Sequence, residues 1–152
     1  MNGLSSRNRK ALAAQLYETL NRYEFVTAAT MVTQPESYLT TWLDVRQTFP
    51  DMRLEPLDSI ADDTWIAVFS VFHGTHHGTA TLPHHGTSLV GAKPTGKTVS
   101  VQQVSVYQAV AGKLSECYTL CDTLSLYQQL GFAPDFMGET LSKPCTSHKF
   151  VT

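Results

Sequence analysis

The sequence is short of charged residues, and this limits what the protein is expected to bind. Asp, Glu, Lys and Arg make up 16% of its 152 residues, whereas about a quarter is usual in soluble domains. Much of the surface is therefore neutral or apolar, which is typical of a self-association surface or an apolar pocket. The net charge is −2 and the 11 basic residues are scattered. Nucleic acid, which favours a positively charged stripe, is not an expected partner.

The sequence also lacks a long apolar run. No segment approaches the roughly 20 apolar residues of a membrane-spanning helix. The N-terminal segment has no apolar core followed by a small-residue cleavage site. We therefore expect a cytoplasmic protein that does not enter a membrane. The three cysteines form an odd set without metal-type spacing, and we interpret them as reduced thiols: Cys117, Cys121 and Cys145.

Helical periodicity marks the first third of the chain. Leucines recur at every fourth position over residues 12–20, which predicts a helix over residues 8–25, with a shorter helical turn over 26–32. Residues 33–36, Thr-Gln-Pro-Glu, have the spacing of a capping box and place proline in a first helical turn. The second main helix is expected to end at residues 49–50, Phe-Pro.

The pattern then changes to strands. Four strands are predicted, over residues 52–58, 64–72, 98–110 and 113–121, the last two forming a hairpin. Proline in the first places it near an edge of the sheet, and residues 73–97 form a long connection. A final helix spans residues 123–130. Helices followed by an antiparallel sheet predict an α+β fold, with a pocket between the helices and the concave face of a curved sheet.

Strand alternation draws attention to Asp122. It places Asp122 on the same face as Leu114, Tyr118 and Leu120, the more apolar face of the strand. A carboxylate in an apolar cavity has a raised pKa and acts as a general acid or base. Alternatively, Asp122 caps the helix that follows it, because aspartate is a favoured N-cap. The pattern leaves both interpretations open.

The preceding strand offers partners for this chemistry. Gln103, Ser105 and Tyr107 share one face by the same alternation. If that face is concave, Gln103 is a neutral donor for an enolate oxygen, and Ser105 and Tyr107 line the pocket. Alternatively, Gln103 lies on the convex side, because the sequence does not fix the register.

Aromatic residues supply candidate pocket walls. We expect Tyr17, Trp42, Trp65 and Tyr118 to contact a ligand. Core packing is the alternative for Tyr17 and the two tryptophans.

Five of the six histidines lie between residues 73 and 85, which raises the possibility of a metal site. The connection over 73–97 contains no Asp, Glu or Cys, and His-rich tracts alone are weak indicators. We therefore predict no metal and interpret the segment as a loop at the pocket mouth, from which His76 or His77 reaches the ligand.

Several short motifs occur in order and together resemble one family, the SnoaL-like polyketide cyclases of the nuclear-transport-factor-2-like superfamily. They are Phe49-Pro50-Asp51, Gly74-Thr75-His76-His77-Gly78, Pro94-Thr95-Gly96-Lys97, the hairpin from Tyr107 to Leu114, and Asp122 followed by Tyr127-Gln128-Gln129-Leu130-Gly131. The resemblance covers residues 8–132, and we expect residues 1–131 to form one domain and residues 132–152 a tail.

The resemblance implies a cone-shaped α+β barrel that is dimeric or tetrameric and needs no metal or organic cofactor. It implies acid/base ring closure of a polyketide-derived substrate, with the family's catalytic aspartate at Asp122 and a pocket glutamine at Gln103. The family's histidine is replaced by Ser105, residues 28–35 are too short for the family's first strand, and residues 79–88 look like an insertion. These departures leave room for isomerisation, epoxide opening, pericyclic closure, a metal-dependent reaction or simple ligand binding.

Overall fold

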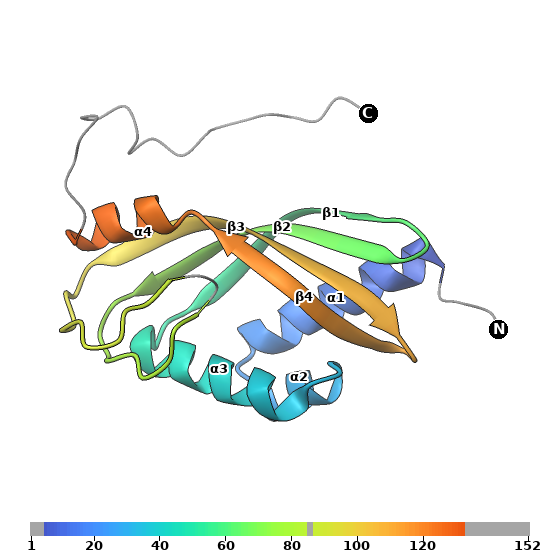
Figure 1. Cartoon of the computed structure of the whole chain (residues 1–152), viewed down its shortest axis with the longest axis horizontal. Helices are drawn as coiled ribbons and strands as arrows, with labels where there is room; N and C mark the ends of the chain where they lie inside the picture. The colour runs from blue at the N-terminus through green and yellow to red at the C-terminus, as the bar shows by residue number, and fades with distance from the viewer. Residues whose placement is uncertain (1–4, 85–86, 133–152) are drawn as a thin grey trace.

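Three helices precede a four-stranded sheet and a fourth follows it (Figure 1). The computed structural model describes residues 5–84 and 87–132, so the predicted tail lies, except for Phe132, outside the described residues. The helices are α1 (Ser6–Asn21), α2 (Phe25–Thr30), α3 (Pro35–Thr48) and α4 (Thr123–Leu130). The strands are β1 (Arg53–Ala61), β2 (Trp65–Thr75), β3 (Thr98–Val110) and β4 (Lys113–Cys121).

The sheet is an antiparallel meander in the order β1-β2-β3-β4. β1 is an edge strand, as its proline predicts, and its register shifts between Pro56 and Asp58. Ala111 and Gly112 join β3 to β4 with φ values of 50° and 77°, the backbone signs of a type I′ turn, which glycine adopts without strain. In place of the family's first strand, Val32 makes one isolated bridge to Leu114.

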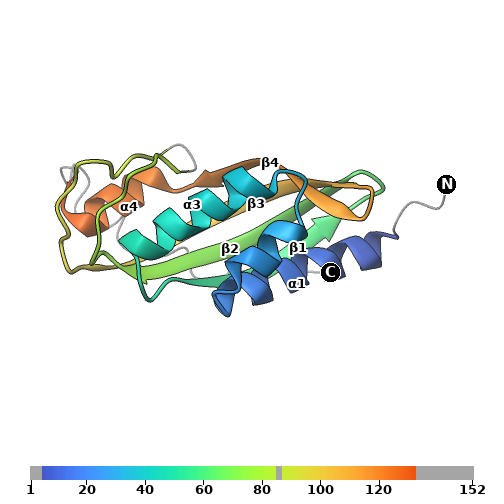
Figure 2. The same ribbon diagram turned by 90° about the horizontal axis from the view of Figure 1, so that it is seen from below.

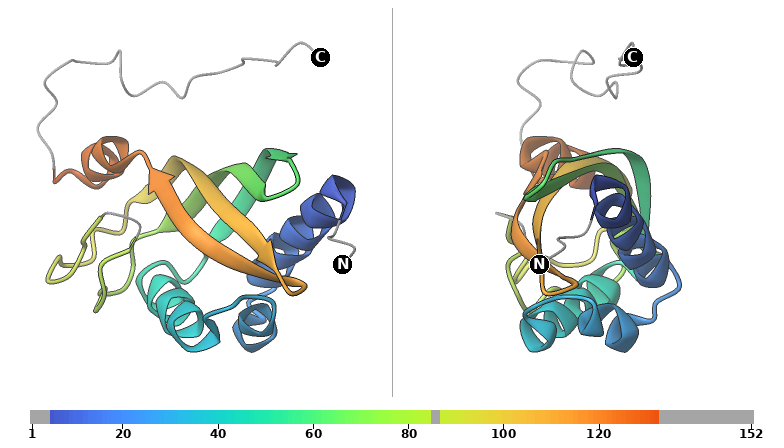
Figure 3. Two further views of the ribbon diagram at one scale, coloured as in Figure 1. Left: turned by 45° about the vertical axis from the view of Figure 1, so that its right-hand side comes forward. Right: turned by 90° about the vertical axis from the view of Figure 1, so that its right-hand side faces the viewer.

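The helices cover one face of this sheet. Seen from below, α1 and α3 cross the strands (Figure 2), and the end view shows the sheet curving over them (Figure 3). The buried side chains of this interface include Leu16 and Leu20 from α1, Ile66 from β2 and Leu114 from β4. Each such side chain contributes about 1.5–3 kcal/mol on burial. The predicted α+β layout, with helices on the concave face of a curved sheet, is confirmed.

Two helix boundaries differ from the predictions. The first helix ends at Asn21 because Tyr23 adopts a positive φ of 61°, and its hydroxyl donates to the Met52 carbonyl over 3.0 Å. The predicted capping box is absent, since the N-cap of α3 is Gln34 and makes no side-chain cap bond. The Thr33 amide donates to the Leu114 carbonyl instead, which extends the bridge to β4 and delays the start of the helix.

The connection between β2 and β3 folds back beside α3 (Figures 1 and 3). The amides of His77 and Gly78 both donate to the Thr48 carbonyl, at 3.2 and 3.0 Å, and so satisfy the C-terminal end of α3. A Cβ atom on Gly78 would lie 1.8 Å from the Gln47 carbonyl oxygen, so only glycine permits this approach. Within the described residues, no helix combines the length and apolar character needed to cross a membrane.

Candidate functional site

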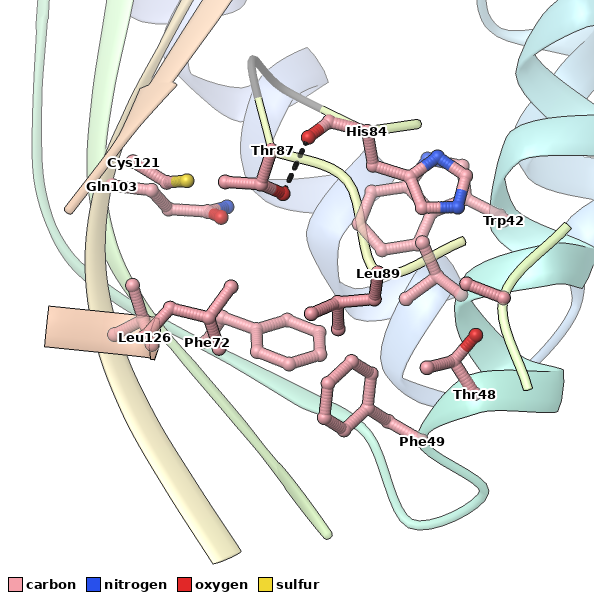
Figure 4. Close-up of a pocket in the computed structure, with 13 residues that line it drawn as sticks. Trp42, Thr48, Phe49, Phe72, His84, Thr87, Leu89, Gln103, Cys121 and Leu126 are labelled. Carbon is pink, nitrogen blue, oxygen red and sulfur yellow. Dashed lines mark hydrogen bonds between the residues drawn. The ribbon is translucent and has the colours of Figure 1, made fainter. Parts of the chain in front are cut away.

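An apolar cavity of about 60 Å³ lies between α3 and the concave face of the sheet (Figure 4). Phe49 and Phe72 meet there edge to face, with ring centroids 5.2 Å apart, and Leu89 and Leu126 complete the apolar wall. This volume admits a few water molecules or a small ligand group. We call it the inner cavity.

Gln103 brings a polar group into this apolar space. Its side chain is buried on the concave face and lies beside Cys121, reaching in from the sheet side in Figure 4. Within the described residues its amide has no hydrogen-bond partner. The placement is the one that strand alternation favoured, while the role of Gln103 as a donor to an enolate stays a prediction.

The other two candidates on β3 are buried but line neither this cavity nor the neighbouring cleft. Ser105 bonds the Thr119 hydroxyl over 2.7 Å, and Thr119 in turn donates to Glu116 over 2.7 Å. Tyr107 is fully enclosed in the core, where burial first and Tyr17 second raise its pKa well above the ordinary value. Both residues are therefore part of the wall behind the cavity and not of its surface.

The expectation that Asp122 is buried in an apolar cavity is wrong, although Asp122 does line an open cleft of about 550 Å³ together with Gln103. Asp122 is exposed and accepts the Ser125 amide over 3.0 Å as the N-cap of α4, which was the alternative interpretation. The role of Asp122 as the acid/base group stays a prediction, but it has no buried cavity to support it.

A β-bulge explains the reversal. Tyr107 pairs with Glu116 while Val106 pairs with Tyr118, so β4 contains one extra residue between these two positions. An extra residue reverses the alternation beyond it. Thr119 is therefore buried, whereas Tyr118 and Asp122 are exposed.

The predicted aromatic walls separate into two groups. Trp42 lines the inner cavity and Tyr118 lies on the rim of the neighbouring cleft. Tyr17 belongs to the core, as its alternative interpretation held. Trp65 is exposed and, since it alternates with the buried Ile66, it lies on the convex face of the sheet.

The two histidines expected to reach a ligand do not line the cavity. His76 is fully buried between Phe49 and Phe132, with ring centroids at 5.6 and 6.2 Å, and burial lowers its pKa. Its Nδ1 accepts the Thr95 amide over 3.3 Å. His77 is exposed. No group of three or more His, Cys, Asp or Glu residues among those described is arranged to hold a metal ion.

A larger cleft of about 400 Å³ adjoins the inner cavity. It lies between the start of α3 and β4, and Trp42 and His84 line both spaces. Tyr38 and Glu116 lie on its wall, and burial first, with Glu116 second, raises the pKa of the Tyr38 phenol well above its ordinary value. The Tyr38 phenol therefore stays protonated at neutral pH. We call this space the outer cleft.

At the junction stands a pair that the sequence did not single out, Asp44 and His84. His84 Nε2 lies 2.6 Å from the Asp44 carboxylate, and the buried His84 Nδ1 has no hydrogen-bond partner among the residues that the structure describes. Asp44 also accepts the Thr81 amide over 2.8 Å, the Thr81 hydroxyl, and the Leu82 amide over 3.3 Å. One signal was available: an acid on a helix whose neighbours Trp42 and Val45 face the core, in a chain whose His-rich loop contains no acid.

The electrostatics of Asp44 follow from these contacts. Burial alone would raise the pKa of its carboxyl, but the hydrogen bonds from Thr81, His84 and Leu82 outweigh burial and hold the pKa below its ordinary value. The carboxylate is therefore ionised at neutral pH. A buried nitrogen that lacks a partner costs about 1–3 kcal/mol relative to a satisfied one.

The structure is an α+β fold with helices on the concave face of a curved sheet and two adjoining cavities. A family model described as SnoaL-like polyketide cyclase matches residues 21–130. The chain belongs to the SnoaL-like polyketide cyclase family, which confirms the resemblance seen in its motifs.

Solved structures agree on the fold. AclR from Streptomyces galilaeus, a candidate hydroxylase, is 22% identical with a TM-score of 0.73, covering 91% of this chain and 94% of its own. IdmH from Streptomyces antibioticus, a candidate polyketide cyclase, is 20% identical with a TM-score of 0.64, covering 80% and 97%. A candidate SnoaL-like polyketide cyclase from Jannaschia sp. CCS1 is 12% identical with a TM-score of 0.69, covering 89% and 99%. A comparison with curated proteins found no match.

Proposed function

We propose that the protein is a cofactor-independent enzyme that closes a ring in a polyketide-derived intermediate by acid/base, aldol-type chemistry. The observation that carries the proposal is Gln103, a buried amide without a partner among the described residues, set in an otherwise apolar cavity of a SnoaL-like polyketide cyclase. A neutral donor in a dry site suits an oxygen that becomes negatively charged only during the reaction.

The sequence of steps is short. A base removes a proton from carbon next to a ketone, and the C–H electrons form an enolate. The enolate oxygen accepts a hydrogen bond from the Gln103 side-chain amide. The enolate carbon then attacks a second carbonyl of the same molecule. The proton then returns to the new alkoxide. The walls formed by Phe49, Phe72 and Trp42 hold the chain folded so that the reacting carbons meet.

The sizes of the inner cavity and the outer cleft indicate which part of a substrate each one holds. The outer cleft, about 400 Å³, falls within the range of small-molecule sites, about 300–1,000 Å³. The inner cavity, about 60 Å³, accommodates only a small part of a ligand. We therefore place the body of the substrate in the outer cleft, with one group passing Trp42 toward Gln103.

Adjacent glutamines on β3 provide a matched test. Gln103 is buried and Gln102 is exposed, because neighbouring strand residues point to opposite faces. The probe is hydroxyacetonaphthone, an aromatic methyl ketone whose methyl protons exchange with deuterium from solvent when an enolate forms. NMR measures the rate. Gln103→Leu is expected to lower kcat by about 100-fold, as removal of an oxyanion donor does, and Gln102→Leu to leave it unchanged. Equal rates for both variants would contradict the proposal.

One observation favours a second reaction. The inner cavity has no carboxylate among its described lining residues, and a pericyclic closure depends on shape more than on an acid or base. A catalyst of that kind would give no enolate exchange with the ketone probe, yet would still bind hydroxyacetonaphthone and lose that binding when Trp42 is replaced by alanine.

We further propose that the protein works in the cytoplasm as a homodimer or homotetramer. The convex face of the sheet exposes Trp65 and Leu120, and such an apolar face supports self-association. The odd number of cysteines in the sequence, three, suits a reducing compartment. Light scattering of the purified protein tests the assembly state, and a monomer at micromolar concentration would contradict it.

A further inference from the structure

The Asp44 carboxylate fixes which nitrogen of His84 carries a proton. Thr81, Leu82 and His84 all direct donors at Asp44, and an ionised carboxylate only accepts. His84 Nε2 must therefore be the donor in the 2.6 Å contact. In the neutral ring this leaves the lone pair on Nδ1.

The lone pair on His84 Nδ1 is the next feature of this pair. Among the described residues, the buried Nδ1 has no hydrogen-bond partner, and the same holds for His76 Nε2. Of these two histidines, only His84 lines the inner cavity and the outer cleft. In Figure 4 both ring nitrogens of His84 lie on the side away from Gln103 and Cys121. His84 lines the outer cleft as well as the inner cavity, so a substrate held in the outer cleft lies next to its ring.

Two other titratable groups that line these spaces, Cys121 and Tyr38, keep their protons. Burial raises the pKa of the Cys121 thiol, and burial raises that of the Tyr38 phenol, so both stay protonated at neutral pH. Tyr118 is a phenol on the rim. Glu116 already accepts the Thr119 hydroxyl over 2.7 Å and has a further interaction. His84 offers a nitrogen that has no hydrogen-bond partner among the described residues.

We propose that His84 is the catalytic acid/base group, that its Nδ1 exchanges the proton with a substrate in the outer cleft, and that Asp44 is the positioning residue. The assignment rests on the proposed function and names its proton carrier. Nδ1 takes the proton from the carbon acid, the C–H electrons become the enolate, and the ring becomes an imidazolium balanced by Asp44. The imidazolium then returns the same proton to the alkoxide, so no oxidant, reductant or metal is consumed.

The test uses deuterium exchange of hydroxyacetonaphthone by the full chain. His84→Gln keeps an N–H donor for Asp44 but has no basic lone pair. It is expected to lower kcat by at least about 100-fold with KM changed by less than about 3-fold. The matched control is His73→Gln, since His73 also bonds a carboxylate, Glu55, over 2.8 Å but lies outside both cavities. Its kcat is expected to equal that of the wild type.

The outcomes separate the assignment from the proposed function. If His84→Gln exchanges the probe as fast as the wild type, the assignment is overturned. If Asp122→Asn or Glu116→Gln abolishes exchange instead, that carboxylate is the base and the proposed function survives. If the wild type gives no exchange, the proposed function fails, and the assignment of His84 as its proton carrier falls with it.

A spectroscopic readout tests the role of Asp44 without a substrate. Proton–nitrogen correlation NMR of imidazole-labelled protein is expected to show His84 as the Nε2–H tautomer. Asp44→Asn is expected to convert His84 to a mixture of tautomers and to lower kcat, whereas a structural role would leave the tautomer unchanged. An Nδ1–H tautomer in the wild type would overturn the proposal.

Discussion

Each side of the sheet carries a histidine bonded to a carboxylate, and the two pairs have nearly the same length. His84 lies 2.6 Å from Asp44 on the concave side, and His73 lies 2.8 Å from Glu55 on the outside. Their surroundings differ. The side chains of His84 and Asp44 are 14% and 5% exposed, against 27% and 45% for His73 and Glu55. Distance alone therefore does not distinguish a functional pair from a surface pair.

The second nitrogen completes the contrast. His73 Nδ1 bonds the Ser100 hydroxyl over 2.7 Å, so both of its nitrogens are occupied, whereas His84 Nδ1 has no partner within residues 5–84 and 87–132. The hydrogen bond from His73, with the charge of Arg53, holds the pKa of Glu55 below its ordinary value. An exposed pair of this kind contributes little to stability. Burial and an unoccupied nitrogen set the inner pair apart.

The largest expected effect comes from removing the carboxylate of the buried pair, Asp44, and the comparison is removal of the exposed carboxylate, Glu55. Asp44→Ala is expected to lower the free energy of unfolding by about 3 kcal/mol, because it leaves several buried donors without an acceptor. Glu55→Ala is expected to leave the Tm nearly unchanged, since its pair is solvated. Urea unfolding followed by circular dichroism measures both. Equal destabilisation by the two variants would remove the distinction drawn between the pairs.

The pH dependence of the Asp44 effect is the next largest. The folded pKa of Asp44 lies below its ordinary value of 3.8, so the unfolded chain takes up the proton first. The carboxylate therefore stabilises the fold above about pH 4, and this stabilisation is lost as the pH falls through the lowered folded pKa. The difference in unfolding free energy between wild type and Asp44→Asn should be greatest near pH 7 and shrink below pH 4.

Other acids do not confuse this measurement. Burial acts to raise the pKa of Asp51, but hydrogen bonds from Thr75 outweigh burial and lower it. Backbone hydrogen bonds lower the pKa of Asp62. Both groups are present in wild type and variant, so their contributions cancel in the difference. A difference that grows on acidification would contradict the direction assigned to the Asp44 pKa.

A smaller effect is expected from a backbone change in the loop that carries His84. Gly78→Ala is expected to cost about 1–3 kcal/mol, as overpacking does, because its Cβ would meet the Gln47 carbonyl. It should also move the loop that carries His84 and slow exchange of the ketone probe. The control is Gly91→Ala, where a Cβ meets nothing within 4 Å but φ is +81°. Its expected cost is about 1 kcal/mol, with exchange unchanged.

The sequence predicted β3 and β4 to the residue because the hairpin signals are local: an Ala-Gly turn between a valine-rich run and a second run without Gly or Pro. The direction of Asp122 was not predictable in the same way. Alternation assigns faces only while each residue opposes one partner, and no composition signal marked the extra residue between Glu116 and Tyr118.

The pair at the cavity junction was harder still to foresee. Asp44 and His84 are 40 positions apart, and their meeting depends on the path of a loop with little regular structure. Local patterns reveal that Asp44 is an acid on a largely apolar helix and that His84 belongs to a His-rich loop. They do not reveal that the amides of Thr81 and Leu82 bring the two together, because that contact is set by tertiary packing.

The smallest expected effect concerns Asp122, the exposed acid that strand alternation had placed inside. Asp122→Ala is expected to lower the free energy of unfolding by about 1 kcal/mol, because it removes the side-chain acceptor for the Ser125 amide at the start of α4. Asp122→Asn keeps a side-chain acceptor and should lower the free energy of unfolding by only about a few tenths of a kcal/mol. If the cap is its whole contribution, both variants exchange hydroxyacetonaphthone at the wild-type rate. A normal Tm combined with a large loss of exchange in Asp122→Asn would instead show that α4 moves during the reaction and that the acid reaches the substrate from the outside of the sheet.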